Sequence, residues 1–499
     1  MGGHGANPAI ETFARMRIHW TMVSIPRCGF GAAGFGDSVS RKKGAPMSFS
    51  CRRSPAGGTS PSKSRIAGVV ASALCCAALA CSPGAQNQPV TLTFLDIEWD
   101  LTVRPLAAED LQAFTRATGI RVKAIPRPDG SLNQLALWKE MLGQDSTAPD
   151  VLGIDAIWSG VLSQYLMDLK PSLSAELSSQ SPEILPSYTV GDQVLAIPHH
   201  AYVGVLMYRT DLLERYGYRE PPRTWTELET MAARIQAGER SRGEKDFWGF
   251  VWQGAAGEGI TCAGLEWQMS EGGGRIIEDD RTISVNNPQT IMAWERARRW
   301  VGSISPPGVL SYAKWDAENA WRSGKTAFMR GWASDFSLFA GLKPAPSSTT
   351  RFGVTSVPGG QAGRASTLGG NGLAVARSSR HAREAIELVR FLRQQDAERA
   401  RKHAQAEPPP AFELRELPAA LKPFFRAAES THPGATVVAR PSVVAGQRYE
   451  EVTRAYIREV RSVLTGEKLP SAAAEALEHD LAQITGFRRG PPRSGLVMR

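Results

Sequence analysis

The 499-residue chain carries 58 Lys and Arg against 49 Asp and Glu, a formal net charge of +9. Residues 1–80 hold ten of the basic residues and two of the acidic ones, so the remainder of the chain is close to neutral. A nearly neutral protein has no electrostatic reason to bind polyanions, and we therefore expect no nucleic-acid partner.

A run of small and apolar residues at 66–80 follows Lys63 and Arg65 and ends at Cys81. A charged start, a short apolar middle and small residues before a cleavage point are typical of a bacterial secretory signal. At ~1.5 Å per residue the run is too short to cross a ~30 Å hydrocarbon layer as a permanent membrane helix. The sequence therefore predicts an exported protein.

The residues Ala78-Leu79-Ala80-Cys81 resemble the lipobox of bacterial lipoproteins, in which the cysteine is acylated and becomes the new N-terminus. The resemblance implies a lipid anchor at Cys81; a plain signal peptide cut near Ala85 is the alternative. Because export signals begin at the N-terminus, Met47 is the expected start. This divides the region into an upstream extension that is not translated (1–46), the signal peptide (47–80) and a polar tether (81–88).

Of the six cysteines, only Cys262 lies beyond Cys81. The exported part can therefore form no internal disulfide and no cysteine metal cluster. Its roughly 418 residues can build a large core without disulfides and are enough for two or three domains.

The first half of the exported part alternates strands with amphipathic helices. A buried strand, a helix that ends at Gly119 and a second strand are typical of a right-handed parallel crossover. The expected elements are strands at 90–95, 120–124 and 151–154, and helices at 106–118, 132–142 and 161–169.

A second alternating set follows, in which Thr224 and Glu227 form a capping box and Asn287 with Pro288 begins another helix. Two such sets, each below ~200 residues, predict an α/β protein of two lobes with a ligand cleft between them. We expect strands at 194–197, 203–208, 325–329, 352–357 and 367–376, helices at 225–237, from 288 and at 382–392, a mostly helical stretch at 419–484, and a disordered tail at 488–499.

No residue pattern favours catalysis. His199 and His200 are adjacent, and because neighbours on a strand point to opposite faces, we do not expect them to hold one metal ion. The run 272–274 lacks the Lys-Ser/Thr of a phosphate-binding loop, and Gly-x-Ser-x-Gly is absent. No pair of carboxylates is singled out for sugar hydrolysis. We predict no enzyme, no metal site and no cofactor.

Trp99, Trp158 and Trp332 each follow a predicted strand by a few residues. Open α/β sheets bind ligands at the carboxyl ends of their strands. Indole planes stack on the flat C–H faces of carbohydrates, while carboxylates and Arg bind the hydroxyls. We expect these three tryptophans to line the cleft, the alternative being a place in the core.

One series of blocks runs through the chain in a fixed order: 148–151 (APDV) with Asp155, 196–198 (AIP), 208–213 (YRTDLL), 222–228 (PRTWTEL), 247–254 (FWGFVWQG), 258–267 (EGITCAGLEW), 305–308 (SPPG) and 439–442 (ARPS). Together these blocks resemble the extracellular solute-binding proteins of bacterial ABC importers, and most closely the trehalose- and maltose-binding branch. The resemblance covers about residues 90–470.

The resemblance implies two α/β lobes joined by crossover segments near Pro198 and Leu368, which close on one ligand. It also implies a monomer that delivers its sugar to permease subunits and touches the membrane only through its N-terminal lipid. The implied lobes are 89–198 with about 367–397, and 199–366 with about 398–487.

By position, Asp155 matches a family aspartate that accepts sugar hydroxyls, and Arg440 matches an arginine that donates to them. Trp332 matches a stacking tryptophan, Gly369-Gly370 a pair whose backbone approaches the ligand, and Glu258 an acidic residue of the cleft. Other roles stay open: a helix cap for the aspartate, a salt bridge between lobes for the arginine, and a water-facing loop carboxylate for the glutamate.

Three cleft positions depart from the family pattern. Tyr202 stands where the family often has an aspartate, Asn371 where it has a tryptophan, and Ser334 where it has a tyrosine. The first two remain candidate ligand contacts. Because losing a buried hydrogen-bonding partner costs several kcal/mol of discrimination, another disaccharide or a related polyol is an alternative to trehalose or maltose.

The sequence thus predicts a lipid-anchored sugar-binding receptor of an ABC importer, located in the periplasm or at the cell surface. Two alternatives stay open. One is a secreted glycoside hydrolase or lyase, which would need two carboxylates ~5–9.5 Å apart across the sugar. The other is a receptor that reports sugar to a membrane sensor.

Overall fold

The computed structural model describes residues 89–95, 105–125, 131–143, 149–333, 351–405, 412–414 and 435–493; at 105–107, 399–405 and 412–414 it describes the backbone alone. The predicted signal, tether and lipid site at Cys81 lie outside the described residues, as do Trp99 and Ser334. Within the described ranges, no helix is both long and apolar enough to span a membrane.

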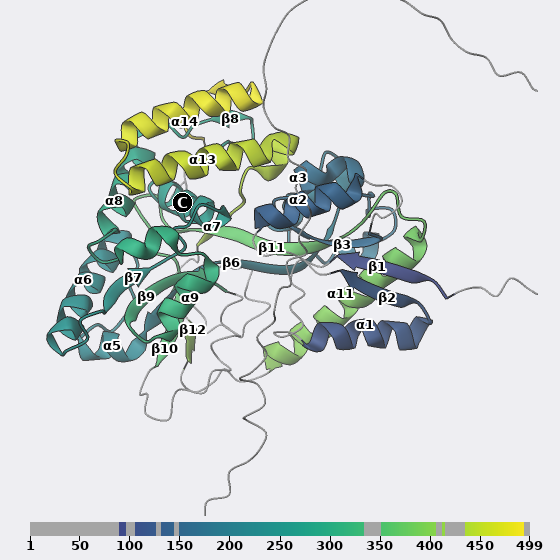
Figure 1. Ribbon diagram of the computed structural model, residues 1–499, viewed down its shortest axis with the longest axis horizontal. Coiled ribbons are helices and arrows are strands. Elements are labelled where there is room, and N and C mark those ends of the chain that lie inside the picture. The colour runs from purple at the N-terminus through teal and green to yellow at the C-terminus, as the bar shows by residue number, and fades with distance from the viewer. Residues whose placement is uncertain are drawn as a thin grey trace, which may run out of the picture. The chain divides into compact units, whose positions relative to one another are not determined.

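A ten-stranded sheet forms the middle of the fold (Figure 1). Its main path runs β12-β10-β6-β11-β3-β1-β2, while β13 pairs with β11, and β9 pairs with both β6 and β7. The strands are β1 (Thr91–Leu95), β2 (Arg121–Ile125), β3 (Val151–Asp155), β6 (Ile197–Arg209), β7 (Trp248–Val251), β9 (Thr326–Trp332), β10 (Phe352–Ser356), β11 (Ala365–Val375), β12 (Phe412–Leu414) and β13 (Thr436–Val438).

Around β1, β2 and β3 the predicted parallel arrangement is confirmed, because β1 pairs in parallel with both neighbours. Helices cover both faces of this part of the sheet. Phe94 of β1 packs in a cluster with α1 and α11, and the next residue, Leu95, packs on the opposite face with α2 and α3. These helices are α1 (Pro105–Thr118), α2 (Ser131–Leu142), α3 (Ser159–Leu162) and α11 (Ala382–Gln405).

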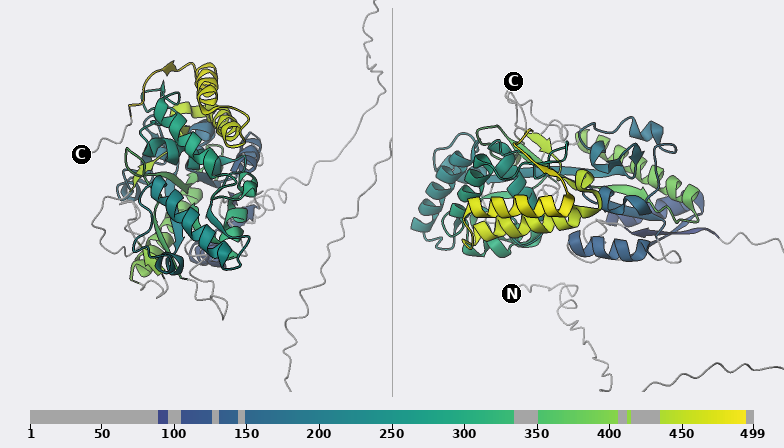
Figure 2. Two further views of the ribbon diagram at one scale, coloured as in Figure 1. Left: turned by 90° about the vertical axis from the view of Figure 1, so that its left-hand side faces the viewer. Right: turned by 90° about the horizontal axis from the view of Figure 1, so that it is seen from above.

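Around β6, β7, β9 and β10 lies a second group of helices with a large apolar core. The capping box is confirmed: Thr224 Oγ1 accepts from the Glu227 amide at 3.1 Å, and Glu227 Oε2 accepts from the Thr224 amide at 3.2 Å. Asn287 caps its helix with its side-chain oxygen, since Oδ1 accepts from the Thr290 amide at 3.0 Å. The helices are α5 (Thr210–Arg215), α6 (Trp225–Ser241), α7 (Glu258–Ser270), α8 (Pro288–Trp300), α9 (Lys314–Arg322), α13 (Tyr449–Leu464) and α14 (Pro470–Thr485), while α12 (Ser442–Ala445) packs between α3 and α13. Figure 2 shows α13 and α14 packed side by side.

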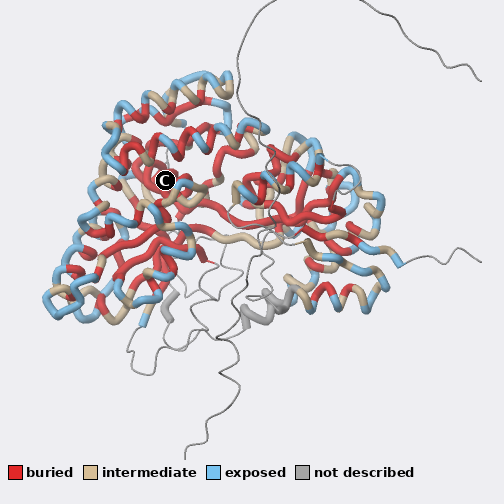
Figure 3. Tube along the Cα trace, viewed as in Figure 1, coloured by how far each residue is buried: buried red, intermediate tan, exposed pale blue. Residues whose placement is uncertain are grey.

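The long strands β6 and β11 pair with each other and join the two groups. On one side β11 pairs with β3, and on the other β6 pairs with β9 and β10. All of β11 is buried, whereas the stretch 199–202 of β6 is half-buried (Figure 3).

Several elements differ from the expected ones. The two strands expected at 194–197 and 203–208 are mainly one strand, β6, because β11 continues the ladder through the polar residues between them. Helix α3 ends early because Met167 donates its amide to Val375 of β11 at 2.9 Å. Helix α11 runs past 392 because Gln, Ala, Glu and Arg, which favour helices, follow.

The remaining short elements are α4 (Ser174–Leu177), β4 (Thr189–Val190), β5 (Gln193–Val194), β8 (Thr282–Ile283) and β14 (Arg488–Arg489). The last of these corrects the expectation of a disordered tail from residue 488. Strand β14 pairs in parallel with β8, and Arg488 and Arg493 both form ion pairs with Asp280 at 2.8 Å. These ion pairs hold the first part of the predicted tail against the fold. Of the tail, residues 494–499 lie outside the described range.

Candidate functional site

Asp155 lies at the carboxyl end of β3, where open α/β sheets place ligand contacts. Its strand partner is Asn371 of β11. Its carboxylate accepts from the Ile157 amide at 3.2 Å and from Ser131 Oγ of α2 at 3.4 Å. The residue at the N-cap of α3 is Trp158, so Asp155 does not cap that helix.

Arg440 follows β13 and joins Asp155 to Glu258. Its Nη1 donates to Glu258 Oε2 at 2.7 Å, and its Nη2 lies 3.4 Å from Asp155 Oδ1. The segment after it approaches α3 closely, since a Cβ on Gly160 would lie 2.5 Å from the Ser442 carbonyl oxygen. The Arg440 side chain is only 3% exposed, which makes this a buried ion-pair network.

Glu258 is the first residue of α7, and protein groups occupy both of its carboxylate oxygens. Oε1 accepts from Thr453 Oγ1 at 2.8 Å, and Oε2 accepts from Tyr449 at 2.9 Å as well as from Arg440. Tyr449 and Thr453 both lie on α13. A negative charge at a helix N-terminus is also favourable in itself. Glu258 is therefore a held, largely buried carboxylate and not a loop residue facing water.

Two groups of this network, Asp155 and Tyr449, do not titrate as they would in water. Burial raises the pKa of Asp155 to about 6, against the lowering effect of Arg440, and the Glu258 charge raises it further. Burial, followed by the Glu258 charge, also raises the pKa of the Tyr449 phenol well above its usual value. Tyr449 therefore stays protonated and acts as a donor, while Asp155 can change charge near neutral pH.

Trp332, the last residue of β9, lies in a second cluster on the same sheet. Its ring meets Tyr202 edge to face, with centroids 5.3 Å apart. The Arg330 guanidinium lies 4.0 Å from the indole centroid and is itself fixed by Glu266 at 2.6 Å. A cation on one face of an indole, held by a buried carboxylate, fixes the plane of the ring.

Residues 368–371 of β11 connect the two clusters. The Leu368 carbonyl lies 3.5 Å from Arg440 Nη2, and the Gly370 carbonyl accepts from the Ala156 amide at 3.0 Å. A Cβ on Gly369 would lie 2.5 Å from Tyr202 and 2.9 Å from Trp332, so both rings require glycine here. At Gly370 the φ of +133° and a Cβ position 2.2 Å from the His200 carbonyl oxygen likewise exclude other residues.

Three buried polar atoms around Asp155 have no hydrogen-bond partner among the described residues: Trp158 Nε1, Asn371 Oδ1 and Arg440 Nε. Trp158 is fully buried and meets Trp138 edge to face at 5.7 Å. Buried polar atoms are almost always paired in folded proteins. The unpaired donor of Arg440, which contacts Asp155, and the unpaired acceptor of Asn371, its strand partner, therefore suit a polar ligand.

Of the residues predicted from the sequence, Asp155, Glu258, Arg440 and Asn371 gather in the first cluster with Trp158, and Tyr202, Gly369 and Trp332 gather in the second. The sequence analysis missed Tyr449 and Thr453, whose spacing of four places them on one helix face. It also missed Arg330 and Glu266. The available signal was Arg330 itself, a charged residue in the largely apolar strand TAFMRGW. Because arginine is rarely buried without a partner, its position predicts a buried carboxylate beside it.

Comparison with known proteins agrees with this architecture. The chain is 40% identical over 378 residues to a probable ABC transporter-binding protein of Deinococcus radiodurans, covering 75% of this chain and 89% of that one. Among solved structures, maltose-bound MalE3 of T. maritima superposes with a TM-score of 0.66 at 29% identity, covering 79% of this chain and all of that one. The GacH receptor of Streptomyces glaucescens gives 0.64 at 21% identity, covering 80% and 100%.

These structures confirm the predicted two-lobed α/β fold. The relatives are solute-binding proteins and not enzymes, and their family is extracellular, as the predicted export requires. Residues 111–420 match the family model described as bacterial extracellular solute-binding protein. The chain belongs to this family.

Proposed function

We propose that this protein is the sugar-binding lipoprotein of an ABC importer. It captures a trehalose- or maltose-like disaccharide, or a related sugar, and hands it to a membrane permease without changing it. Cys81 carries the lipid, and the exported protein acts as a monomer in the periplasm or at the cell surface.

The observation that carries the proposal is the pair of clusters joined by β11. Asp155 and Arg440 offer an ionised acceptor and donor, which bind sugar hydroxyls with strength and direction. Trp332 and Tyr202 offer aromatic area beside them. The unpaired atoms of Trp158 and Asn371 add a donor and an acceptor.

The ligands of the related proteins support the same class. MalE3 of T. maritima, at 29% identity, is bound to maltose. The GacH receptor, which shares the fold, was solved with acarbose. Both ligands are saccharides, the class that charged and aromatic side chains like those of the two clusters can bind.

We further propose that closure works through β6 and β11. The lobes would comprise 89–198 with about 367–397, and 199–366 with about 398–487, and the two strands cross between them near Pro198 and Leu368. Sugar contacts made from both lobes favour the closed form, which the permease then recognises.

The rival proposal, a carbohydrate-active enzyme, would draw on the raised pKa of Asp155, since such carboxyls serve as general acids. Its partner would have to be Glu258, the other carboxylate of the cluster. However, Arg440, Tyr449 and Thr453 already donate to its two oxygens and hold the carboxylate in place, so it is not free to turn toward a sugar or a water. Binding without chemistry therefore fits better.

A thermal-shift screen of the protein against disaccharides and polyols tests the proposal. A ligand at 100 times its dissociation constant stabilises the fold by about 2.7 kcal/mol, which is readily detected. The best ligand is then titrated by calorimetry into Trp332→Ala, where we expect at least a tenfold loss of affinity. Trp315→Ala is the matched control, because Trp315 is 47% exposed on α9.

No response to any sugar would refute the proposal, and cleavage products after incubation would favour the enzyme. Equal losses in both tryptophan variants would remove Trp332 from the site while leaving sugar binding in place.

A further inference from the structure

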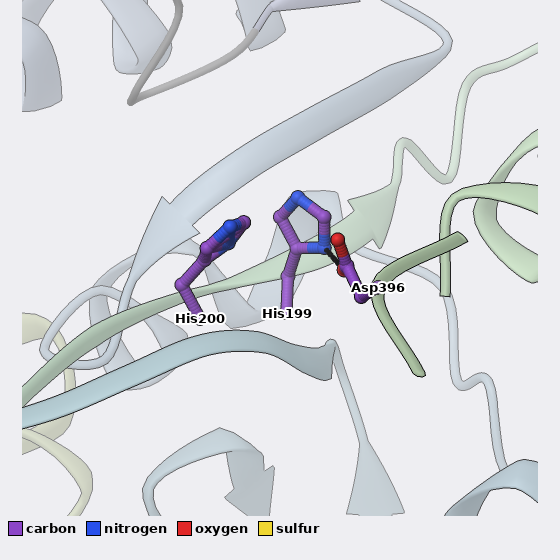
Figure 4. A group of neighbouring side chains, drawn as sticks. All are labelled: His199, His200 and Asp396. Atoms are coloured by element: carbon purple, nitrogen blue, oxygen red, sulfur yellow. Dashed lines mark ion pairs between the residues drawn. The ribbon is translucent and has the colours of Figure 1, made fainter. Parts of the chain in front are cut away.

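Three potential metal ligands meet where the half-buried part of β6 passes α11: His199, His200 and Asp396 (Figure 4). One ligand atom from each residue lies within 4.8 Å of the others. The two imidazole centroids are 4.0 Å apart, and His199 Nδ1 forms an ion pair with Asp396 Oδ2. None of the three side chains belongs to the Asp155 or the Trp332 cluster.

The structure overturns the expectation that His199 and His200 point to opposite faces. His200 pairs with Asn371 of β11, but the next pair is Pro198 with Gly372, so His199 has no opposite residue. This register shift is a β-bulge, in which two residues of one strand oppose one residue of the other. The bulge breaks the alternation of side chains, and both imidazoles lie on the side of Asp396.

We propose that these residues form a binding site for a divalent transition metal, with Zn²⁺ as the best match. Two imidazole nitrogens and one carboxylate oxygen are a common three-ligand set for zinc, with water in the fourth position. Calcium and magnesium prefer sites built from oxygen alone. All three residues are half-buried, so solvent can reach the cluster and supply the water.

A metal ion bound here would take the place of the ion pair between His199 Nδ1 and Asp396 Oδ2. The residues come from two elements far apart in sequence, a crossing strand and a helix packed against it. A bound ion would therefore tie β6 to α11 with bonds stronger than the existing ion pair.

One neighbouring charge opposes the metal. Arg393, one turn before Asp396 on α11, has its Nη1 3.5 Å from Asp396 Oδ2 and donates to the His199 carbonyl at 3.2 Å. Burial lowers the pKa of Arg393, although the nearby Asp396 charge works against this. Arg393 thus competes for the carboxylate, so its removal should strengthen metal binding.

The test is a calorimetric titration of the full chain, prepared without a polyhistidine tag, with ZnCl₂ alone. We expect one site per chain with a micromolar or tighter dissociation constant. His200→Asn and Asp396→Asn should each weaken binding at least tenfold, and Arg393→Gln should tighten it. His479→Asn, an exposed histidine of α14, is the matched control and should leave binding unchanged.

A measurement on the unaltered protein guards against variants that fail to fold. Co²⁺ in a site of two imidazoles and a carboxylate gives intense visible absorption, unlike the pale spectrum of the hydrated ion. The proposal is overturned if Co²⁺ keeps its hydrated spectrum and Zn²⁺ gives no heat. It is also overturned if folded Asp396→Asn binds Zn²⁺ as well as the unaltered chain does. Neither outcome bears on sugar binding.

Discussion

Asp155→Asn should change how the stability of the protein depends on pH. Burial raises the pKa of this carboxyl from 3.8 to about 6. At 1.36 kcal/mol for each pKa unit, the charged form destabilises the folded state by about 3 kcal/mol once the pH is well above 6. Below 3.8 both states hold the proton and the effect vanishes. The free energy of unfolding therefore falls as the pH rises from about 4 to about 6. Asn carries no charge, so the Asp155→Asn variant does not show this fall.

About 1 kcal/mol of the effect has already appeared at pH 4.5, so about 2 kcal/mol should appear between pH 4.5 and 7.5. We expect Asp155→Asn to gain this amount relative to the unaltered protein, measured by urea unfolding with tryptophan fluorescence at both pH values. Asp279→Asn is the control, because that side chain is 78% exposed. If the difference between Asp155→Asn and the unaltered protein is the same at both pH values, the Asp155 carboxylate is not destabilised by burial.

Two further changes test other parts of the chain. Arg440→Gln should lower the free energy of unfolding by about 3–5 kcal/mol, because it leaves the buried Asp155 and Glu258 carboxylates without a cation. The exposed pair of Arg448 should be worth less than about 1 kcal/mol, so an equal loss in Arg448→Gln would contradict the role of Arg440. Cys81→Ser should move the protein from the membrane fraction to the soluble fraction, and continued anchoring would disprove the lipid.

Local signals predicted the parts of the fold that depend on neighbours in sequence. The capping box at Thr224 and Glu227 and the cap at Asn287 lie where the sequence placed them, since a few adjacent groups decide such contacts. Helix α7 was missed because eleven of its residues are buried, and a helix covered on all sides shows no apolar stripe.

Local sequence patterns did not predict the contacts between segments that are far apart in the sequence. Individual residues of the first cluster were found through family resemblance, but not the bridge that Arg440 makes between β3 and α7. The bulge at His199 depends on the register of β11, which lies far along the chain, and alternation along one strand gives the wrong answer there.

The ladder between β6 and β11 has a mechanical consequence. In the proposed division into lobes, β6 and β11 are two of the crossings, and because these strands are bonded to each other, neither offers a loop on which a lobe could swivel freely. Any opening of the lobes must twist the paired strands β6 and β11 along their length. The stiffness of this pair limits both the direction and the size of the motion. Proteases, which need an extended and unpaired backbone, should accordingly cut slowly at these crossings.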